Sequence, residues 1–179
     1  PLSLGGGIQS RDDAELLIKS GADKVVLNSN VYANPSLVTA IADKFGSQAV
    51  VVGIDVRFDA ERNEYQLFSN CGREKQPVTL REHVSRMTEA GAGEILIQSI
   101  DRDGSMEGYD VDLVKKVMSY TDIPVIALGG AGTYDHMRSA FLETNVGALA
   151  CGSLFNFGDN NPIRAKAHLT NYGLNFKKV

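Results

Sequence analysis

Short runs of apolar and β-branched residues alternate along this chain with segments of helical pattern. We expect the runs to be strands, and they lie at Leu2–Leu4, Lys24–Asn28, Ala49–Asp55, Glu94–Ser99, Pro124–Leu128 and Ala148–Cys151. Strands that alternate with helices are typical of a parallel sheet with crossover helices. The sequence therefore predicts an α/β protein.

Helix-start signals fall in the intervals between the predicted strands. A first helix is expected at Asp12–Ser20, and Asn34–Pro35 predicts a second one that Gly46 ends. Thr79 with Glu82 has the spacing of a capping box. Three further N-caps are expected at Asp110, Thr133 and Asn161.

The six βα units are fewer than the eight of a closed (β/α)₈ TIM barrel, which needs about 250 residues. The chain has 179 residues and opens on Pro1, already close to a strand end. We therefore expect residues 1–179 to be one barrel domain that lacks the two N-terminal units. The polar stretch Arg57–Asn70 alternates around Glu64–Phe68 and predicts a hairpin inserted in a βα loop. A doubly wound open sheet also accommodates six parallel strands.

An internal repeat favours the barrel over the open sheet. Gly5–Gly6 recurs as Gly129–Gly130 at an offset of 124 residues, and Ser29 recurs as Ser153 at the same offset. These residues lie at corresponding strand ends, so each half reads as strand, glycine-rich turn, helix, strand and serine-containing turn. A duplicated half-barrel explains this placement.

Two glycine-rich turns, Gly5–Ile8 and Gly129–Gly132, each follow a predicted strand. Glycines let the backbone approach an anion, and the amides at the start of the next helix point toward it. Each turn is paired with a second one on the following strand, at Asn28–Ser29 and at Gly152–Ser153. We interpret the two pairs as two phosphate cradles at one barrel mouth, although ordinary βα turns have the same composition.

Asp55 ends the predicted strand VVVGID, and barrel active sites lie at the carboxyl ends of the strands. An apolar wall beside it would raise its pKa toward the range of general acid–base catalysis. The alternative is a helix cap, or an ion pair with Arg57 or Arg62.

The segment SIDRDGS follows the next strand and places two aspartates in a glycine turn. Asp101 is expected to serve the turn itself or to pair with a neighbouring loop. Asp103, beside Gly104, is expected to reach a ligand. Lys24 and Glu94 instead open two strands, so they belong at the opposite end of the barrel as a structural ion pair or as a polar gate.

The composition excludes several classes of function. The formal net charge is −4 with both signs interspersed, which predicts no nucleic-acid surface. No apolar run is long enough to span a bilayer, and no signal peptide is visible. The three histidines and two cysteines lack metal-ligand spacing, so no metal or other cofactor is expected, and a reducing cytoplasm fits best.

Taken together, PLSLGGGI, GADKVVLNS, FGSQAVVVGIDV, GAGEILIQSIDRDGS and PVIALGGAG resemble, in order and spacing, the cyclase subunit family of imidazole glycerol phosphate synthase. The similarity covers essentially the whole chain. It implies a (β/α)₈ barrel that closes a bis-phosphorylated formimino ribonucleotide with ammonia, giving imidazole glycerol phosphate and an aminoimidazole carboxamide ribotide. It also implies a glutaminase partner docked at the N-terminal face of the barrel.

The resemblance also assigns roles to individual residues. Asp55 matches one of two catalytic aspartates, and the other belongs to a first strand that this chain does not contain. The residues that match the first phosphate site are Gly7, Asn28 and Ser29. Those that match the second are Asp103, Gly104, Gly130, Gly152 and Ser153. Lys24 and Glu94 match the ring of charges through which ammonia passes.

Three residues depart from the family pattern. Gln98 stands where Thr is usual, Leu128 where Ser is usual and Asn156 where His is usual. Gln98 and Leu128 are expected to face the mouth, where they would change the size and polarity of the substrate pocket. Similar replacements occur in a paralogous group that channels ammonia for amidation of surface-polysaccharide sugars. A non-catalytic barrel that only hands on ammonia, and a folding fragment of the cyclase, are further alternatives.

Overall fold

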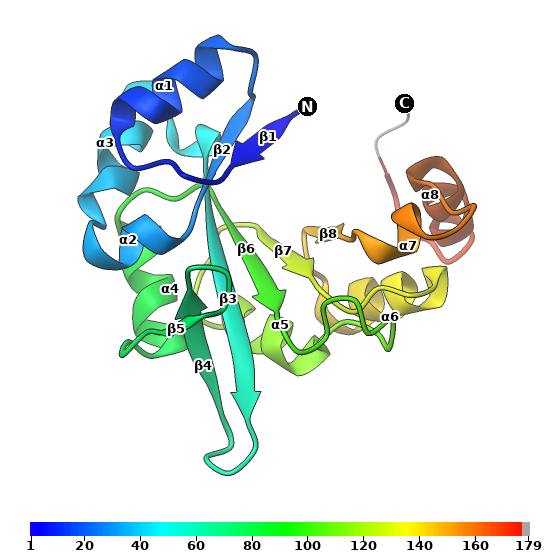
Figure 1. Cartoon of the computed structure of the whole chain (residues 1–179). Coiled ribbons are helices and arrows are strands. Elements are labelled where there is room, and N and C mark those ends of the chain that lie inside the picture. The colour runs from blue at the N-terminus through cyan, green and yellow to red at the C-terminus, as the bar shows by residue number, and fades with distance from the viewer. Residues whose placement is uncertain (177–179) are drawn as a thin grey trace.

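One curled parallel sheet forms the centre of the molecule in a computed structural model, which describes residues 1–176 (Figure 1). Its parallel strands are β1 (Ser3–Gly5), β2 (Lys24–Leu27), β3 (Val50–Asp59), β6 (Glu94–Ser99), β7 (Val125–Leu128) and β8 (Ala148–Ala150). They pair in the order in which they occur in the chain. A doubly wound sheet reverses its strand order at one point, so the partial barrel is confirmed and the open-sheet alternative is wrong.

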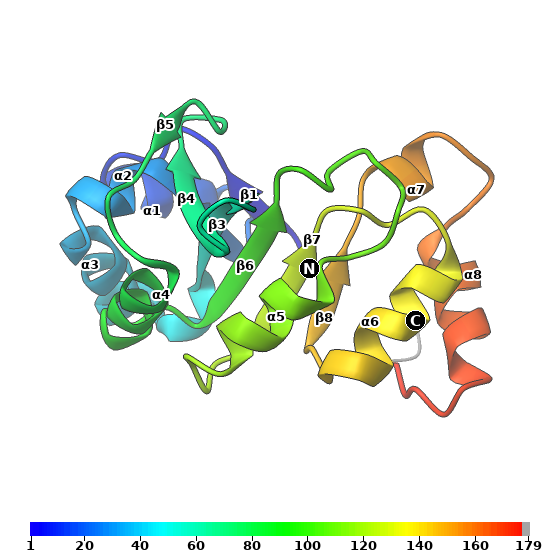
Figure 2. The ribbon, with the colours of Figure 1, turned by 90° about the horizontal axis from the view of Figure 1, so that it is seen from below.

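Helices cover one face of this sheet (Figure 2). The longer ones are α1 (Arg11–Lys19), α3 (Ser36–Phe45), α4 (Leu80–Glu89), α5 (Val111–Met118), α6 (Tyr134–Thr144) and α8 (Pro162–Thr170). Residues of β2, β6 and β7 alternate between buried and partly buried. The buried apolar residues of these strands belong to the hydrophobic core under the helices. The partly buried residues between them therefore face the concave side of the sheet. Within residues 1–176, no helix is both long and apolar enough to cross a membrane.

The helix starts follow the capping signals of the sequence. Thr79 and Glu82 form the expected capping box at the start of α4. The side chains of Asp110, Thr133 and Asn161 each accept a backbone N–H in the first turn of α5, α6 and α8. An N-cap side chain typically contributes about 1 kcal/mol. Local hydrogen bonding alone therefore defines these boundaries.

Two short helices, α2 (Ser29–Ala33) and α7 (Ser153–Asn156), were not predicted. Elements of five and four residues are too short to show a helical period. They begin at the repeated serines, directly after β2 and β8. The sequence of elements β1, α1, β2 and α2 thus recurs as β7, α6, β8 and α7, as the interpretation of a duplicated half-barrel expects.

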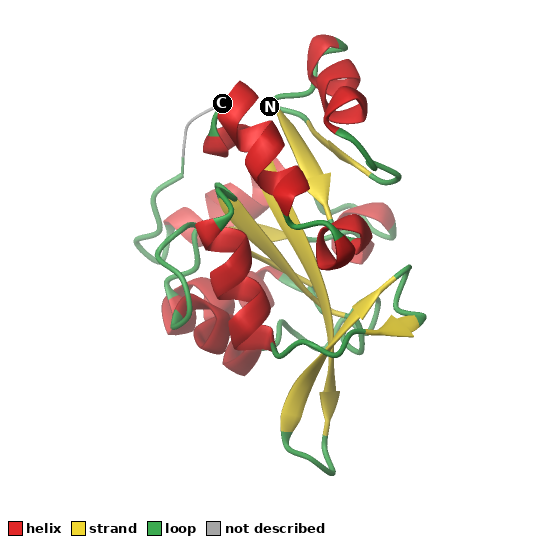
Figure 3. Ribbon diagram, turned by 90° about the vertical axis from the view of Figure 1, so that its left-hand side faces the viewer, coloured by secondary structure: helices red, strands yellow, loops and turns green. Residues whose placement is uncertain are grey.

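The end of β3 differs from expectation. The strand continues past Asp55 to Asp59, then turns into β4 (Glu64–Ser69), which leads to the two-residue strand β5 (Glu74–Lys75). Figure 3 shows this hairpin projecting beyond the rest of the sheet. The predicted hairpin is therefore confirmed, but the predicted strand end at Asp55 is wrong, because β4 supplies new hydrogen-bond partners to β3.

His83 of α4 is fully buried and stacks on Tyr32 of α2, with ring centroids 4.1 Å apart. Its Nδ1 lies 3.4 Å from a guanidinium nitrogen of Arg86. Burial, with a smaller contribution from the Arg86 charge, lowers the pKa of His83 to about 4. The imidazole is therefore neutral in the folded protein over most of the pH range.

We predict that His83 makes the protein less stable in mild acid. In the unfolded chain the His83 imidazole binds a proton below about pH 6.5, whereas in the folded chain it does so only below about pH 4. The unfolding free energy should fall across that window by about 1.4 kcal/mol per pH unit. Urea unfolding at pH 7 and pH 5 measures the change. His83→Phe keeps the ring stack and should lose this component of the slope; equal slopes in both proteins would contradict the prediction.

Candidate functional site

Four residues form one row across the carboxyl edge of the sheet. Asp55 pairs in register with Gln98, Gln98 with Leu128, and Leu128 with Ala150. Asp55, Gln98 and Leu128 are partly buried, as residues on the concave face are. The row therefore lines the barrel mouth, as expected for Gln98 and Leu128.

The first predicted cradle surrounds a cavity of about 500 Å³. Gly6 and Gly7 adopt φ of 101° and 70°, a region that glycine enters without strain. Gly7, Asn28 and Ser29 line the cavity together with Asp55. The Oδ1 atom of Asn28 is buried and has no hydrogen-bond partner within residues 1–176. As a buried acceptor this oxygen cannot bind an anion itself, so the contribution of Asn28 to an anion site would come from its N–H groups.

The second predicted cradle is also assembled, but around much less space. Its cavity measures about 10 Å³ and is lined by Asp103, Gly104, Leu128, Gly130, Gly152 and Ser153, among others. That volume holds about one water molecule. The Gly130 carbonyl accepts the Gly108 N–H at 2.7 Å, and a Cβ on Gly130 would lie 2.1 Å from the Gly108 carbonyl oxygen. Only glycine allows the loop to pack this closely.

Part of the helix start beside the first cradle is already occupied. The two amides just before α1 are not available to an anion, because the Asp13 carboxylate accepts both the Gln9 and the Ser10 N–H. This bonding, together with acceptance of the Asp13 N–H by Ser10, is the capping box of α1. Donors for an anion therefore come from the glycine turn, from the residues after β2 or from the first N–H groups of α1 itself.

Asp55 has the environment of a functional carboxylate. Burial raises its pKa, the nearby Asp103 charge raises it further, and hydrogen bonding by the Asn28 side chain opposes both effects. The ion pairs considered from sequence are absent within residues 1–176, because Arg57 pairs with Asp101 and Arg62 with Asp59. Without a cationic partner, burial shifts Asp55 toward holding a proton.

The two aspartates after β6 have separate roles. Asp101 accepts the Phe58 N–H at 3.3 Å and lies 3.8 Å from Arg57, so it ties this loop to the hairpin. Asp103 accepts a hydrogen bond from Gln98 Nε2 at 3.0 Å. Gln98 therefore holds the Asp103 carboxylate above the same row that contains Asp55.

Lys24 and Glu94 form an ion pair at the opposite, amino-terminal end of the sheet. The pair joins β2 to β6 and so spans the intervening β3 on the concave face. Both side chains are largely buried, at 27% and 22% exposure. The expected ion pair is confirmed.

Sequence reasoning missed the turn between β4 and β5. Asn70 and Cys71 line the same cavity as the first cradle, and the Asn70 N–H donates to Ser29 Oγ at 3.0 Å. No local pattern announces this contact, because it joins residues 41 positions apart through the path of the hairpin.

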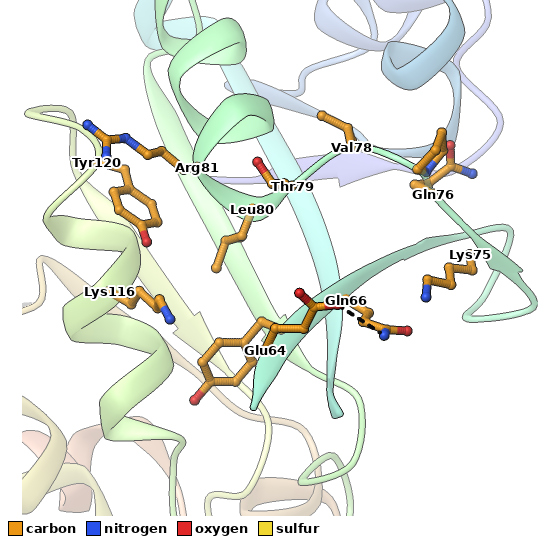
Figure 4. A pocket seen from close by; sticks show the side chains of 12 residues that line it. Glu64, Gln66, Lys75, Gln76, Val78, Thr79, Leu80, Arg81, Lys116 and Tyr120 are labelled. Atoms are coloured by element: carbon orange, nitrogen blue, oxygen red, sulfur yellow. Dashed lines mark hydrogen bonds between the residues drawn. The ribbon is translucent and has the colours of Figure 1, made fainter. Parts of the chain in front are cut away.

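A separate cavity of about 450 Å³ lies between β4, the segment before α4 and α5 (Figure 4). Lys75, Arg81 and Lys116 line it beside Tyr65 and Tyr120. None of the predicted site residues contributes to it. Among the residues described, no group of three or more His, Cys, Asp or Glu side chains is placed to hold a metal ion.

Comparison with known proteins places the chain in a family. The family model described as "Histidine biosynthesis protein" matches residues 1–160. The chain is 40% identical over 178 residues to imidazole glycerol phosphate synthase subunit HisF of Alkaliphilus metalliredigens, covering 99% of this chain and 70% of that protein. The HisF subunit of Hyphomonas neptunium is 42% identical over 179 residues, which cover 100% of this chain and 70% of that protein.

A third relative carries the same name. Subunit HisF of Streptococcus mutans is 40% identical over 174 residues, which cover 97% of this chain and 69% of that protein. The identity is at this level across nearly the whole chain in all three relatives. The chain belongs to the histidine biosynthesis protein family that includes the HisF subunit of imidazole glycerol phosphate synthase.

Proposed function

We propose that this chain is the cyclase barrel of imidazole glycerol phosphate synthase. It uses ammonia to convert a bis-phosphorylated formimino-aminoimidazole-carboxamide ribonucleotide into imidazole glycerol phosphate. The observation that carries the proposal is the position of Asp55, a carboxylate without a cationic partner in residues 1–176, between two glycine-rich cradles at one sheet edge.

The two cradles set the orientation of the substrate. One lies at the ends of β1 and β2 and the other at the ends of β7 and β8, with β3 and β6 between them. A substrate with a phosphate at each end then places its reacting centre over Asp55 and Gln98. The first cradle is open, whereas the second, with about 10 Å³ of free space, admits a phosphate only when the residues that line it move apart.

Asp55 acts as a general acid–base in this scheme. Its raised pKa brings the carboxyl closer to the pH at which it both accepts and donates protons. The Asn28 side chain stabilises the Asp55 carboxylate by hydrogen bonding, whereas the Asp103 charge destabilises it, so the pKa of Asp55 depends on both neighbours. Ring closure with ammonia requires protons to be moved between nitrogen atoms and a leaving group, and a carboxyl in this state serves that need.

Ammonia enters from the far end of the barrel, past Lys24 and Glu94. A glutaminase partner docked over that end supplies it, in agreement with the word "subunit" in the names of the relatives. We place the reaction in the cytoplasm, because Cys71 and Cys151 are both free thiols and a reducing compartment keeps them so.

Asp55→Asn tests the assignment of the acid–base group. We expect cyclisation to slow by about 10²–10⁴-fold, the usual contribution of a general acid–base. Substrate binding should change little, because the amide has the same shape. The effect is measured as the steady-state rate with ammonium salts, in the full-length protein. Asp59→Asn, on the same strand but in the hairpin, is the matched control; equal rates in the two variants would assign Asp55 to structure.

Lys24→Ala tests the gate. We expect glutamine-dependent product formation to fall while the reaction with free ammonium stays largely intact, because only the first depends on passage through the barrel. Both rates are measured in the complex with the glutaminase.

The control for this variant is Lys44→Ala. Lys44 forms a similar ion pair with Glu15, but it joins α3 to α1 on the outside of the barrel. Lys44→Ala should leave the ratio of the glutamine-dependent rate to the ammonium-dependent rate unchanged. Equal losses with glutamine and with ammonium in Lys24→Ala would show that its ion pair only stabilises the barrel.

A further inference from the structure

Two strands, β2 and β4, pair with successive parts of the same edge of β3. β6 occupies one edge of β3 as far as Val56. β2 occupies the other edge only up to Val52, and β4 pairs with β3 from Asp55 onward. Because β4 runs back toward β2, the turn that follows it must arrive where β2 ends. The hairpin therefore returns to the mouth of the barrel.

The turn makes a direct contact there. The Asn70 N–H donates to Ser29 Oγ at 3.0 Å, and the Asn70 side-chain amide donates to Glu74 at 2.5 Å. Asn70, Cys71 and Gly72 all have positive φ, at 50°, 59° and 72°. Three successive left-handed residues curl the backbone tightly, and this brings the exposed Cys71 to the wall of the 500 Å³ cavity.

The contact also orients the Ser29 hydroxyl. A serine oxygen that accepts one hydrogen bond still has its own proton to donate. With the Asn70 N–H on one side of the oxygen, that proton is free to point into the cavity, where Gly7 and Asn28 lie. A donor prepared in this way suits a phosphate oxygen.

We propose that Asn70 and Cys71 form a third wall of the first phosphate cradle, in which the Asn70 amide positions Ser29 and the Cys71 side chain borders the bound phosphate. The inference rests on the proposed function, since it requires a phosphate group in that cradle. Asn70 is a positioning residue that acts through Ser29, and Cys71 is a contact residue for the substrate.

Protection of the Cys71 thiol tests the wall. Inorganic phosphate, at about ten times its dissociation constant, should slow alkylation of Cys71 by iodoacetamide about tenfold, because only the unoccupied fraction reacts. Mass spectrometry of the Cys71 peptide measures the rate. The control is Asn63→Cys in a Cys71→Ser background. Asn63 is also exposed, with φ of 54°, but lies at the far end of the same hairpin, and its thiol should react equally fast with and without phosphate.

Amide NMR separates this inference from the proposed function. On addition of phosphate, the N–H signals of Gly7 and Asn70 should both shift, and the Asn70 shift should be lost in Ser29→Ala while Gly7 still reports binding. If the Gly7 signal shifts but Cys71 is not protected and the Asn70 signal does not move, the third wall alone is overturned. Absence of any shift at Gly7 would overturn the phosphate cradle and this inference with it.

Discussion

Parallel pairing of the strands in chain order is the constraint on which the whole site depends. It brings every strand's carboxyl end to one edge, so residues from β1 to β8 meet at one mouth although they are far apart in sequence. The same pairing makes the side chains alternate between the helix-covered core and the concave face. Asp55, Gln98 and Leu128 share a row for this reason, and Lys24 with Glu94 share the opposite end.

The environment of Asp55 disfavours its charged form. Burial disfavours the carboxylate, and the nearby arginines are engaged by Asp59 and Asp101 instead. Removing a carboxylate from water without a cation costs folding free energy. In the proposed function this cost is the counterpart of the raised pKa that proton transfer by Asp55 would use. Asn28 limits the shift by hydrogen bonding to the charged form.

Elements with strong local signals were predictable, and those that depend on the path of the chain were not. The N-caps at Thr79, Asp110 and Thr133 act within a single turn, so three or four residues suffice to predict them. The strand end at Asp55 was mispredicted because β3 gains a partner that only the hairpin supplies. The bond from Gln98 to Asp103 likewise depends on how one loop folds back over its own strand.

The sequence by itself determined the fold class and most helix starts, and it singled out the glycine-rich turns, because periodicity, caps and repeated glycines are local properties of the chain. The tertiary structure decided how these parts meet. It showed that one cradle is open and the other nearly filled, that Asp13 takes the amides before α1, and that the β4–β5 turn reaches Ser29. Such contacts depend on strand register and loop packing, which bring together residues that carry no shared signal along the chain.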